Sequence, residues 1–97
     1  MKISKDELDI LRNIEKEKKI NQRNLSGKLG ISLGKVNYCL KELKKRGLIK
    51  VNNFSKNKSK INYIYLLTPK GIKQKTQAII KFMSIKMKEY EDLKSDL

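Results

Sequence analysis

The chain has 97 residues, enough for one domain with a modest core, and 38% of them are hydrophobic. Lys and Arg number 24 against 10 Asp and Glu, and the net charge of +14 favours an anionic polymer or an anionic membrane surface as partner. The sequence has no histidine and one cysteine, which excludes most metal sites, an internal disulfide and a Cys/His catalytic pair. Because no acid/base pair or activated nucleophile stands out either, we expect no enzyme and no cofactor.

The positive charge is concentrated in the middle of the chain. Residues 41–88 hold 14 Lys and Arg against one acid, whereas residues 89–97 hold four acids and one lysine. This distribution indicates a directed basic face. The N-terminus has no apolar signal-peptide core, no apolar run approaches the ~18 residues of a membrane span, and the single thiol fits a reducing compartment. We therefore expect a cytoplasmic, nucleoid-associated protein.

The first half of the chain predicts three helices. Ser4 with Glu7 is a capping box and predicts a helix over 5–18, followed by a short extended stub at Ile20. Asn21 is a good N-cap for a helix over 22–29, which Gly30 ends. Ser32 caps a third helix that ends at Gly47. Its apolar stripe has the helical spacing i, i+3, i+4, i+7 and consists of Val36, Cys39, Leu40 and Leu43.

The second half predicts a hairpin and a long helix. Residues 48–53 and 61–67 are typical of strands, joined by a polar turn over 55–60. Thr68-Pro69 is a strong helix start, and a helix over 69–94 would be about 37 Å long. Its apolar face is broad, and we expect it to bury against a second copy through Ile72, Ile79, Phe82, Met83, Tyr90 and Leu93. Two alternatives are that the face folds back as ordinary core or inserts into a membrane surface, which the acidic tail would oppose.

The order helix, helix, tight turn, helix, hairpin is that of a winged helix-turn-helix. The turn is short, Gly30-Ile31-Ser32, and the helix after it would enter the major groove of DNA. Lysine, asparagine and serine there can bond base edges. The expected base-contacting residues are Ser32, Gly34, Lys35, Asn37, Tyr38 and Lys41. The alternative is the solvated face of an ordinary surface helix.

Other basic and polar residues are expected to contact phosphate. Gln22 and Arg23 begin the supporting helix, and three lysines crowd the hairpin tip, namely Lys56, Lys58 and Lys60. The tip could instead be only a flexible, soluble loop. Cys39 fits a small core residue, because a redox sensor needs an exposed thiolate of low pKa.

Several segments together resemble the MarR-type winged helix-turn-helix transcriptional regulators, and most of all their short, exopolysaccharide-associated subgroup. The resemblance rests on residues 21–25, 29–40, 47–51, 63–67 and 67–71 and on the Lys/Met/Glu/Tyr-rich ending at 83–93. It implies a homodimeric transcription factor whose residues 32–41 and wing lysines contact DNA. Full-length MarR proteins have further terminal helices that build the dimer and a small-ligand crevice. A chain of 97 residues cannot hold all of them, so we expect no response to phenolic ligands.

The fold class expected is therefore mainly α with a small β-hairpin wing, in which residues 1–68 bind DNA and residues 69–97 form a dimerisation element. The function expected is sequence-specific binding of double-stranded DNA as a homodimer that regulates transcription. The alternative is a winged-helix interaction module that uses helix 69–94 to pair with another protein. RNA binding is disfavoured because no platform of exposed aromatics is evident. The sequence identifies neither the DNA site that would be bound nor a small-molecule effector.

Overall fold

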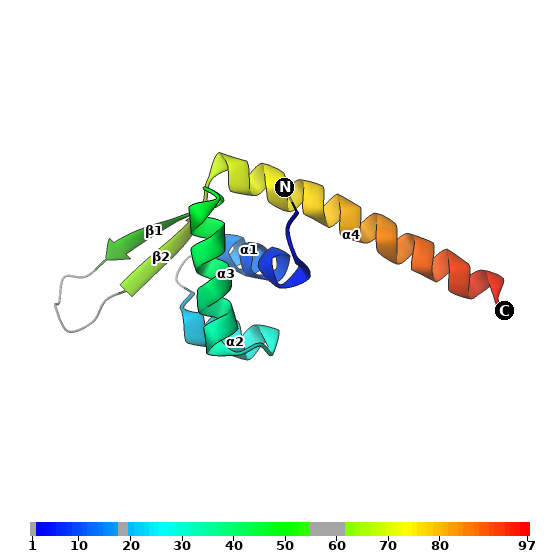
Figure 1. Ribbon diagram of the computed structural model, residues 1–97, viewed down its shortest axis with the longest axis horizontal. Coiled ribbons are helices and arrows are strands. Elements are labelled where there is room, and N and C mark those ends of the chain that lie inside the picture. The colour runs from blue at the N-terminus through cyan, green and yellow to red at the C-terminus, as the bar shows by residue number, and fades with distance from the viewer. Residues whose placement is uncertain (1, 18–19, 55–61) are drawn as a thin grey trace.

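The computed structural model describes residues 2–17, 20–54 and 62–97. Within them the elements follow in the order α1 (Lys5–Lys16), α2 (Gln22–Leu29), α3 (Leu33–Lys45), β1 (Ile49–Phe54), β2 (Asn62–Leu67) and α4 (Pro69–Ser95). The first three helices and the hairpin form a body, and α4 lies across it and projects beyond it, so that the molecule extends 60 × 27 × 20 Å (Figure 1). This confirms the predicted architecture of a winged helix-turn-helix followed by a long helix.

Each helix begins at the predicted residue because a side chain there accepts the first free backbone N–H groups. In every case the cap accepts from the amide three residues further on, which replaces a hydrogen bond the helix itself cannot make. The four N-caps are Ser4, Asn21, Ser32 and Thr68. At the other end of α1 the prediction was wrong, since the helix stops at Lys16 and Glu17 is already extended, with φ −128° and ψ 99°.

Two glycines end α2 and α3 in the left-handed region, where a side chain would be strained. Gly30 has a φ of 66° and Gly47 a φ of 74°. The predicted short turn joins α2 to α3. At its start, Gly30 donates its backbone N–H to the Ser26 carbonyl at 3.0 Å. The helix-turn-helix geometry therefore rests on one residue type that tolerates a positive φ.

The two strands of the hairpin are antiparallel. The first strand, β1, begins and ends one residue later than the predicted range 48–53. Ile49 lies opposite Leu67, and Val51 lies opposite Tyr65. The predicted polar turn over 55–60 and the predicted strand residue Ile61 fall outside the described residues. Ile20, predicted as a short extended stub, belongs to no strand, and its side chain is buried.

The core lies where α1, α2, α3 and the base of the hairpin meet. The predicted stripe of α3 is fully buried against α1, which contributes its own apolar face. The members of this core are Ile10, Leu11, Ile14, Ile20, Leu25, Val36, Cys39, Leu40, Leu43, Leu48, Ile49 and Tyr65. In contrast, α4 buries only Gly71. Since this core fixes α3 through one side only, the opposite side of α3 is left to solvent.

Candidate nucleic-acid interface

The exposed side of α3 carries the residues that the sequence predicts to contact bases. Ser32, Gly34, Lys35, Tyr38 and Lys41 are exposed, and Asn37 is half-buried. The Ser32 hydroxyl accepts the Lys35 backbone N–H at 3.1 Å, which holds the first turn in place. A Cβ built on Gly34 would meet no atom within 4 Å, so the backbone there is open to close approach. The exposed side of α3 is thus continuous and polar, and Lys41 makes it cationic toward the C-terminal end of the helix.

Two hollows flank α3, and each is lined by some of the residues predicted to contact DNA. Lys35 and Tyr38 line a hollow that α1 closes with Ser4 and Glu7. On the other side, Leu33 lines a hollow toward the start of α2 and Tyr65 of β2. The helix therefore presents a cationic edge toward α1 and a mixed apolar and polar edge toward α2.

Leu33 is a residue that sequence reasoning missed. It is the first residue of α3 and is 44% exposed, although it lies three residues before Val36 and so continues the buried stripe. It stays exposed because α3 begins beyond the part of the helix that α1 covers. The available signal was its position at the helix start, where an apolar side chain has little to pack against.

The start of α2 lies beside this second hollow. Asn21, Gln22 and Arg23 line it together with Leu33. The Asn21 side chain accepts the Asn24 backbone N–H at 2.7 Å, and no acid occupies the first turn of α2. Arg23 is exposed and Gln22 is half-buried. A helix start with an added arginine is an electropositive position, which suits a phosphate.

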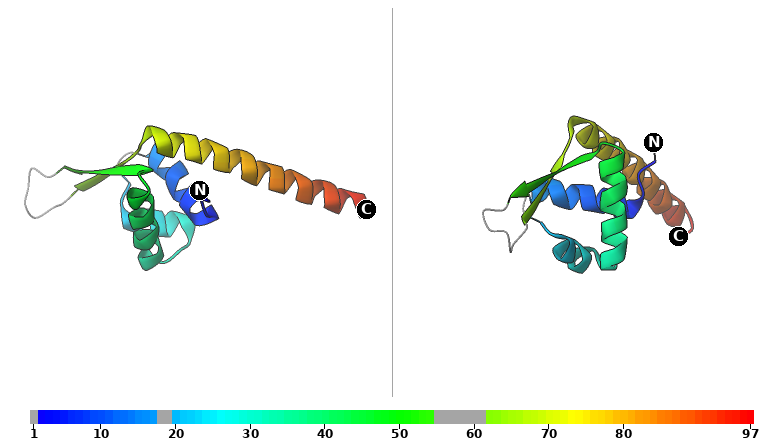
Figure 2. Two further views of the ribbon diagram at one scale, coloured as in Figure 1. Left: turned by 45° about the horizontal axis from the view of Figure 1, so that its top comes forward. Right: turned by 60° about the vertical axis from the view of Figure 1, so that its left-hand side comes forward.

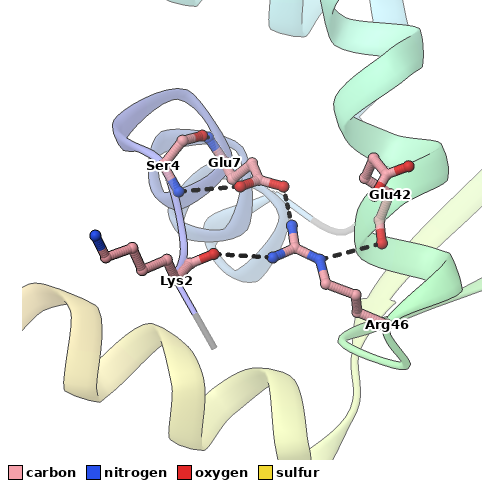
Figure 3. Close-up of polar contacts among 5 residues, drawn as sticks. All are labelled: Lys2, Ser4, Glu7, Glu42 and Arg46. Atoms are coloured by element: carbon pink, nitrogen blue, oxygen red, sulfur yellow. Dashed lines mark hydrogen bonds and ion pairs between the residues drawn. The ribbon is translucent and has the colours of Figure 1, made fainter.

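A network around Arg46 fixes α3 to the N-terminal segment (Figure 3). The guanidinium pairs with the Glu7 carboxylate and donates to the Lys2 carbonyl at 3.0 Å and to the Glu42 carbonyl at 3.4 Å. The other carboxylate oxygen of Glu7 accepts the Ser4 backbone N–H at 3.0 Å. The ion pair is mostly buried, with 21% and 12% of the two side chains exposed. This network, also missed from sequence, ties the C-terminal end of α3 to the start of α1.

The residues predicted for dimerisation all lie on α4, but with unequal exposure. Ile72, Met83, Tyr90 and Leu93 are exposed, whereas Ile79 and Phe82 are half-buried. The half-buried pair lines a groove between α4 and α1, which contributes Leu8. Three further large apolar side chains on α4 are exposed as well: Ile80, Ile85 and Met87. Figure 1 and the left view of Figure 2 both show the C-terminal half of α4 extending past every other element.

The remaining predictions concern the lysines of the hairpin tip, Cys39, metal sites and membrane spans. Lys56, Lys58 and Lys60 lie outside the described residues. Cys39 is buried, and burial is the main cause that raises the pKa of its thiol, with Asp6 adding to the rise and Lys35 opposing it. This is the opposite of a reactive thiolate. Residues 2–17, 20–54 and 62–97 contain no cluster of metal-ligating side chains and no helix long and apolar enough to cross a membrane.

This arrangement of helices and hairpin defines a winged helix-turn-helix domain. Residues 7–50 match the family model described as winged helix-turn-helix, DNA-binding. The match covers α1, α2, α3 and the start of β1, which are the elements that hold and present the exposed side of α3. No curated protein sequence matches the chain.

The fold is also that of several solved transcriptional regulators, among them MarR-family members. The PcaV transcriptional regulator of Streptomyces coelicolor, solved with its natural ligand, matches with a TM-score of 0.75 and 14% identity over 87% of this chain and 58% of its own. A MarR/EmrR family regulator from Acinetobacter sp. ADP1 gives 0.74 and 22% over 92% and 61%. The zinc-responsive MarR family member ZitR of Lactococcus lactis gives 0.71 and 21% over 100% and 65%. The chain thus spans about three fifths of these proteins.

Proposed function

We propose that the chain binds double-stranded DNA as a homodimer, with α3 in the major groove, and regulates transcription from the bound site. The observation that carries the proposal is the two-sidedness of α3. Its apolar stripe is buried against α1, while the opposite side exposes lysine, serine and tyrosine together with an open glycine backbone. A helix held in this way in a strongly basic protein has the chemistry that reads base edges.

Within α3 we assign direct readout to the residues predicted from the sequence and add Leu33. Lysine can donate to guanine O6 and N7, and asparagine can pair with adenine N6 and N7. Leu33 supplies what these polar groups lack, since an apolar side chain can contact the C5-methyl group of thymine. Its exposure at the first turn of α3 and its place beside Asn21 and Arg23 support this role.

The start of α2 and the hairpin supply affinity without sequence preference. Arg23 and Gln22 would contact the phosphate backbone, and the basic residues of the hairpin tip would extend that contact to flanking DNA. The free end of α4 and the hairpin lie at opposite ends of the molecule (Figure 1). Pairing through α4 therefore leaves α3 and the hairpin available to DNA.

The likeness to MarR-family regulators supports this proposal, and with it a location in the cytoplasm and on the nucleoid. A place in the exopolysaccharide-associated subgroup belongs to the same proposal.

The deciding experiment is a mobility-shift titration at several salt concentrations, with duplexes selected from a random pool as probes. If a dimer neutralises about 6 to 10 phosphates, affinity falls roughly 10³- to 10⁵-fold between 50 and 200 mM salt. The selected sites should be inverted repeats with half-sites about 10 to 10.5 base pairs apart. An absence of binding at low salt, with α4 recovered in a complex with a different protein, would establish the interaction module instead.

A further inference from the structure

Five of the exposed apolar residues of α4, together with Thr76, form one stripe that runs from Ile72 to Tyr90, whereas Ile85 and Leu93 lie outside it. At 3.6 residues per turn they fall within about 80° of arc, on a face that borders the groove between α4 and α1, which Met83 and Met87 also line. This outer stripe consists of Ile72, Thr76, Ile80, Met83, Met87 and Tyr90, all of them exposed. Because 60% of Ile80 and 66% of Tyr90 face solvent, the stripe runs from the part of α4 above the body to the part beyond it.

The charges of α4 are segregated along its length. From Pro69 to Lys88 the helix carries six lysines and no acid, and from Glu89 to Leu97 it carries four acids and one lysine. Lys75 is paired with Glu15 of α1, and Lys86 lies near Glu89 at 3.5 Å. Most of the basic half therefore remains without an acidic partner among the residues the structure describes, and the acidic end has no neighbour beyond its own helix.

We infer that a second copy of this chain docks on the outer stripe with its α4 antiparallel, so that the acidic end of each helix lies against the basic start of the other. This inference rests on the proposed homodimer and specifies its orientation. Charge decides between the two orientations, because a parallel pair would set six lysines beside six lysines and stack the acidic ends together.

The antiparallel register follows from two residues at the edge of the stripe. Lys73 and Glu91 are 18 residues apart, which is five full turns, so both lie on the same edge. In an antiparallel pair, residues on the same edge of the two helices face each other. A two-fold axis near Phe82 then sets Lys73 against Glu91 of the second copy, twice in each dimer. With the same axis, Ile72 lies within two residues of the level of Tyr90, and Ile80 lies within one residue of the level of Met83, so that apolar side chains meet along the stripe.

The arrangement also separates the two bodies. Each body packs against the first half of its own α4, so antiparallel helices of 27 residues, about 40 Å long, place the bodies at opposite ends. Successive major grooves on one side of DNA are about 34–36 Å apart, which is a comparable distance. A parallel pair would instead bring both bodies to the same end of the pair, where they compete for space.

Cysteine cross-linking distinguishes the orientations in the full chain. With a short bifunctional maleimide, a mixture of Lys73→Cys and Glu91→Cys proteins should yield a cross-linked dimer, while neither protein alone should. Lys81→Cys is the matched control, since Lys81 lies near the axis but on the polar side of α4, and it should not cross-link. Cys39 is common to all samples and is buried. Cross-linking of Lys73→Cys with itself would overturn the inference.

Charge reversal gives a second, independent measurement. Lys73→Glu should weaken the dimer about 2- to 30-fold in sedimentation equilibrium, because two exposed ion pairs are lost, and Lys73→Glu with Glu91→Lys should restore it. If reversal of both charges adds the two losses instead of cancelling them, the pairing is wrong. The failures are separable, since a parallel dimer that binds DNA overturns only this inference, and an antiparallel dimer that binds no DNA overturns only the proposed function.

Discussion

Gly71 lies against the backbone carbonyl group of Leu48, so closely that no side chain fits between them. A Cβ built on Gly71 would collide with the Leu48 carbonyl oxygen and lie 2.9 Å from its carbonyl carbon. The same oxygen accepts the Thr68 backbone N–H at 3.0 Å, and the Thr68 hydroxyl donates to the Gly47 carbonyl at 2.6 Å. The start of α4 is therefore locked to the end of the α3–β1 turn, which fixes the direction in which α4 leaves the body.

Gly71→Ala should lower the free energy of unfolding by about 1 to 3 kcal/mol, since the added methyl group meets backbone and cannot be relieved by a side-chain rotation. In an ordinary helix the same change stabilises by roughly 0.5 to 1 kcal/mol. Urea unfolding followed by circular dichroism measures the difference. The matched control is Gly27→Ala in α2, where a Cβ meets no atom within 4 Å and stability should rise. An equal gain at both glycines would contradict the close approach.

The start of α4 also shows which parts of the fold are readable in the sequence. Thr68 followed by Pro69 announces a helix because the cap uses only neighbouring residues, and Ser4, Asn21 and Ser32 were readable for the same reason. The contact between Gly71 and Leu48 joins residues 23 positions apart, and its need for glycine arises from how closely the start of α4 passes the turn between α3 and β1. Local hydrogen bonds were thus predictable, whereas the angles between elements were not.

Arg46→Ala should destabilise the fold by about 1 to 3 kcal/mol, because it leaves the mostly buried carboxylate of Glu7 without its cation. Thermal unfolding followed by circular dichroism provides the measurement. Arg12→Ala is the matched control, since Arg12 is exposed and only 3.9 Å from Asp9 in its own helix. Its loss should cost at most about 0.5 kcal/mol. If the two substitutions lowered stability equally, the network around Arg46 would contribute no more than an exposed ion pair.

At neutral pH, the Cys39 thiol should be alkylated slowly in the folded protein and rapidly in the protein unfolded by urea. Burial raises its pKa above the ordinary value of 9.0, so the folded state favours the neutral thiol. The resulting stabilisation is complete below pH 9.0 and is lost as pH rises toward the higher pKa of the folded state. The stability advantage of the native protein over Cys39→Ala should therefore stay constant below pH 9.0 and shrink as the pH rises above it. Rapid labelling of the folded protein would refute the burial.

The interface was readable in part. Helical spacing separated the buried stripe of α3 from its exposed side, because a period of 3.6 residues is a local property. Leu33 escaped that separation, since its spacing assigns it to the stripe and only the reach of α1 decides that it is exposed. On α4 the spacing placed Ile72, Tyr90 and Phe82 on one apolar face, but Ile72 and Tyr90 are exposed whereas Phe82 lines the groove with α1.

Leu33 should make binding sensitive to single thymine methyl groups. Replacing one thymine of the selected half-site by uracil removes only the C5-methyl group and should weaken binding several-fold, since the apolar contact is lost. Scanning the half-site position by position in mobility-shift titrations locates the contact. The Leu33→Ala protein should bind the thymine and uracil forms equally at that position. A uracil effect of the same size in Leu33→Ala would show that another residue, such as Tyr38, contacts the methyl group.

Asn37 and Arg23 should differ in what their loss changes, because Asn37 lies on the side of α3 that we propose contacts bases, whereas Arg23 lies at the start of α2. Asn37→Ala should reduce discrimination between the selected site and its single-base variants by about 1 to 3 kcal/mol, and Lys35→Ala should do the same at another position. Arg23→Ala should weaken binding to all sequences alike and reduce the slope of log affinity against log salt by about 1. Both effects come from titrating one panel of duplexes at several salt concentrations. Uniform weakening by all three substitutions would mean that α3 contacts only phosphate, and selectivity would then have to come from the shape of the DNA.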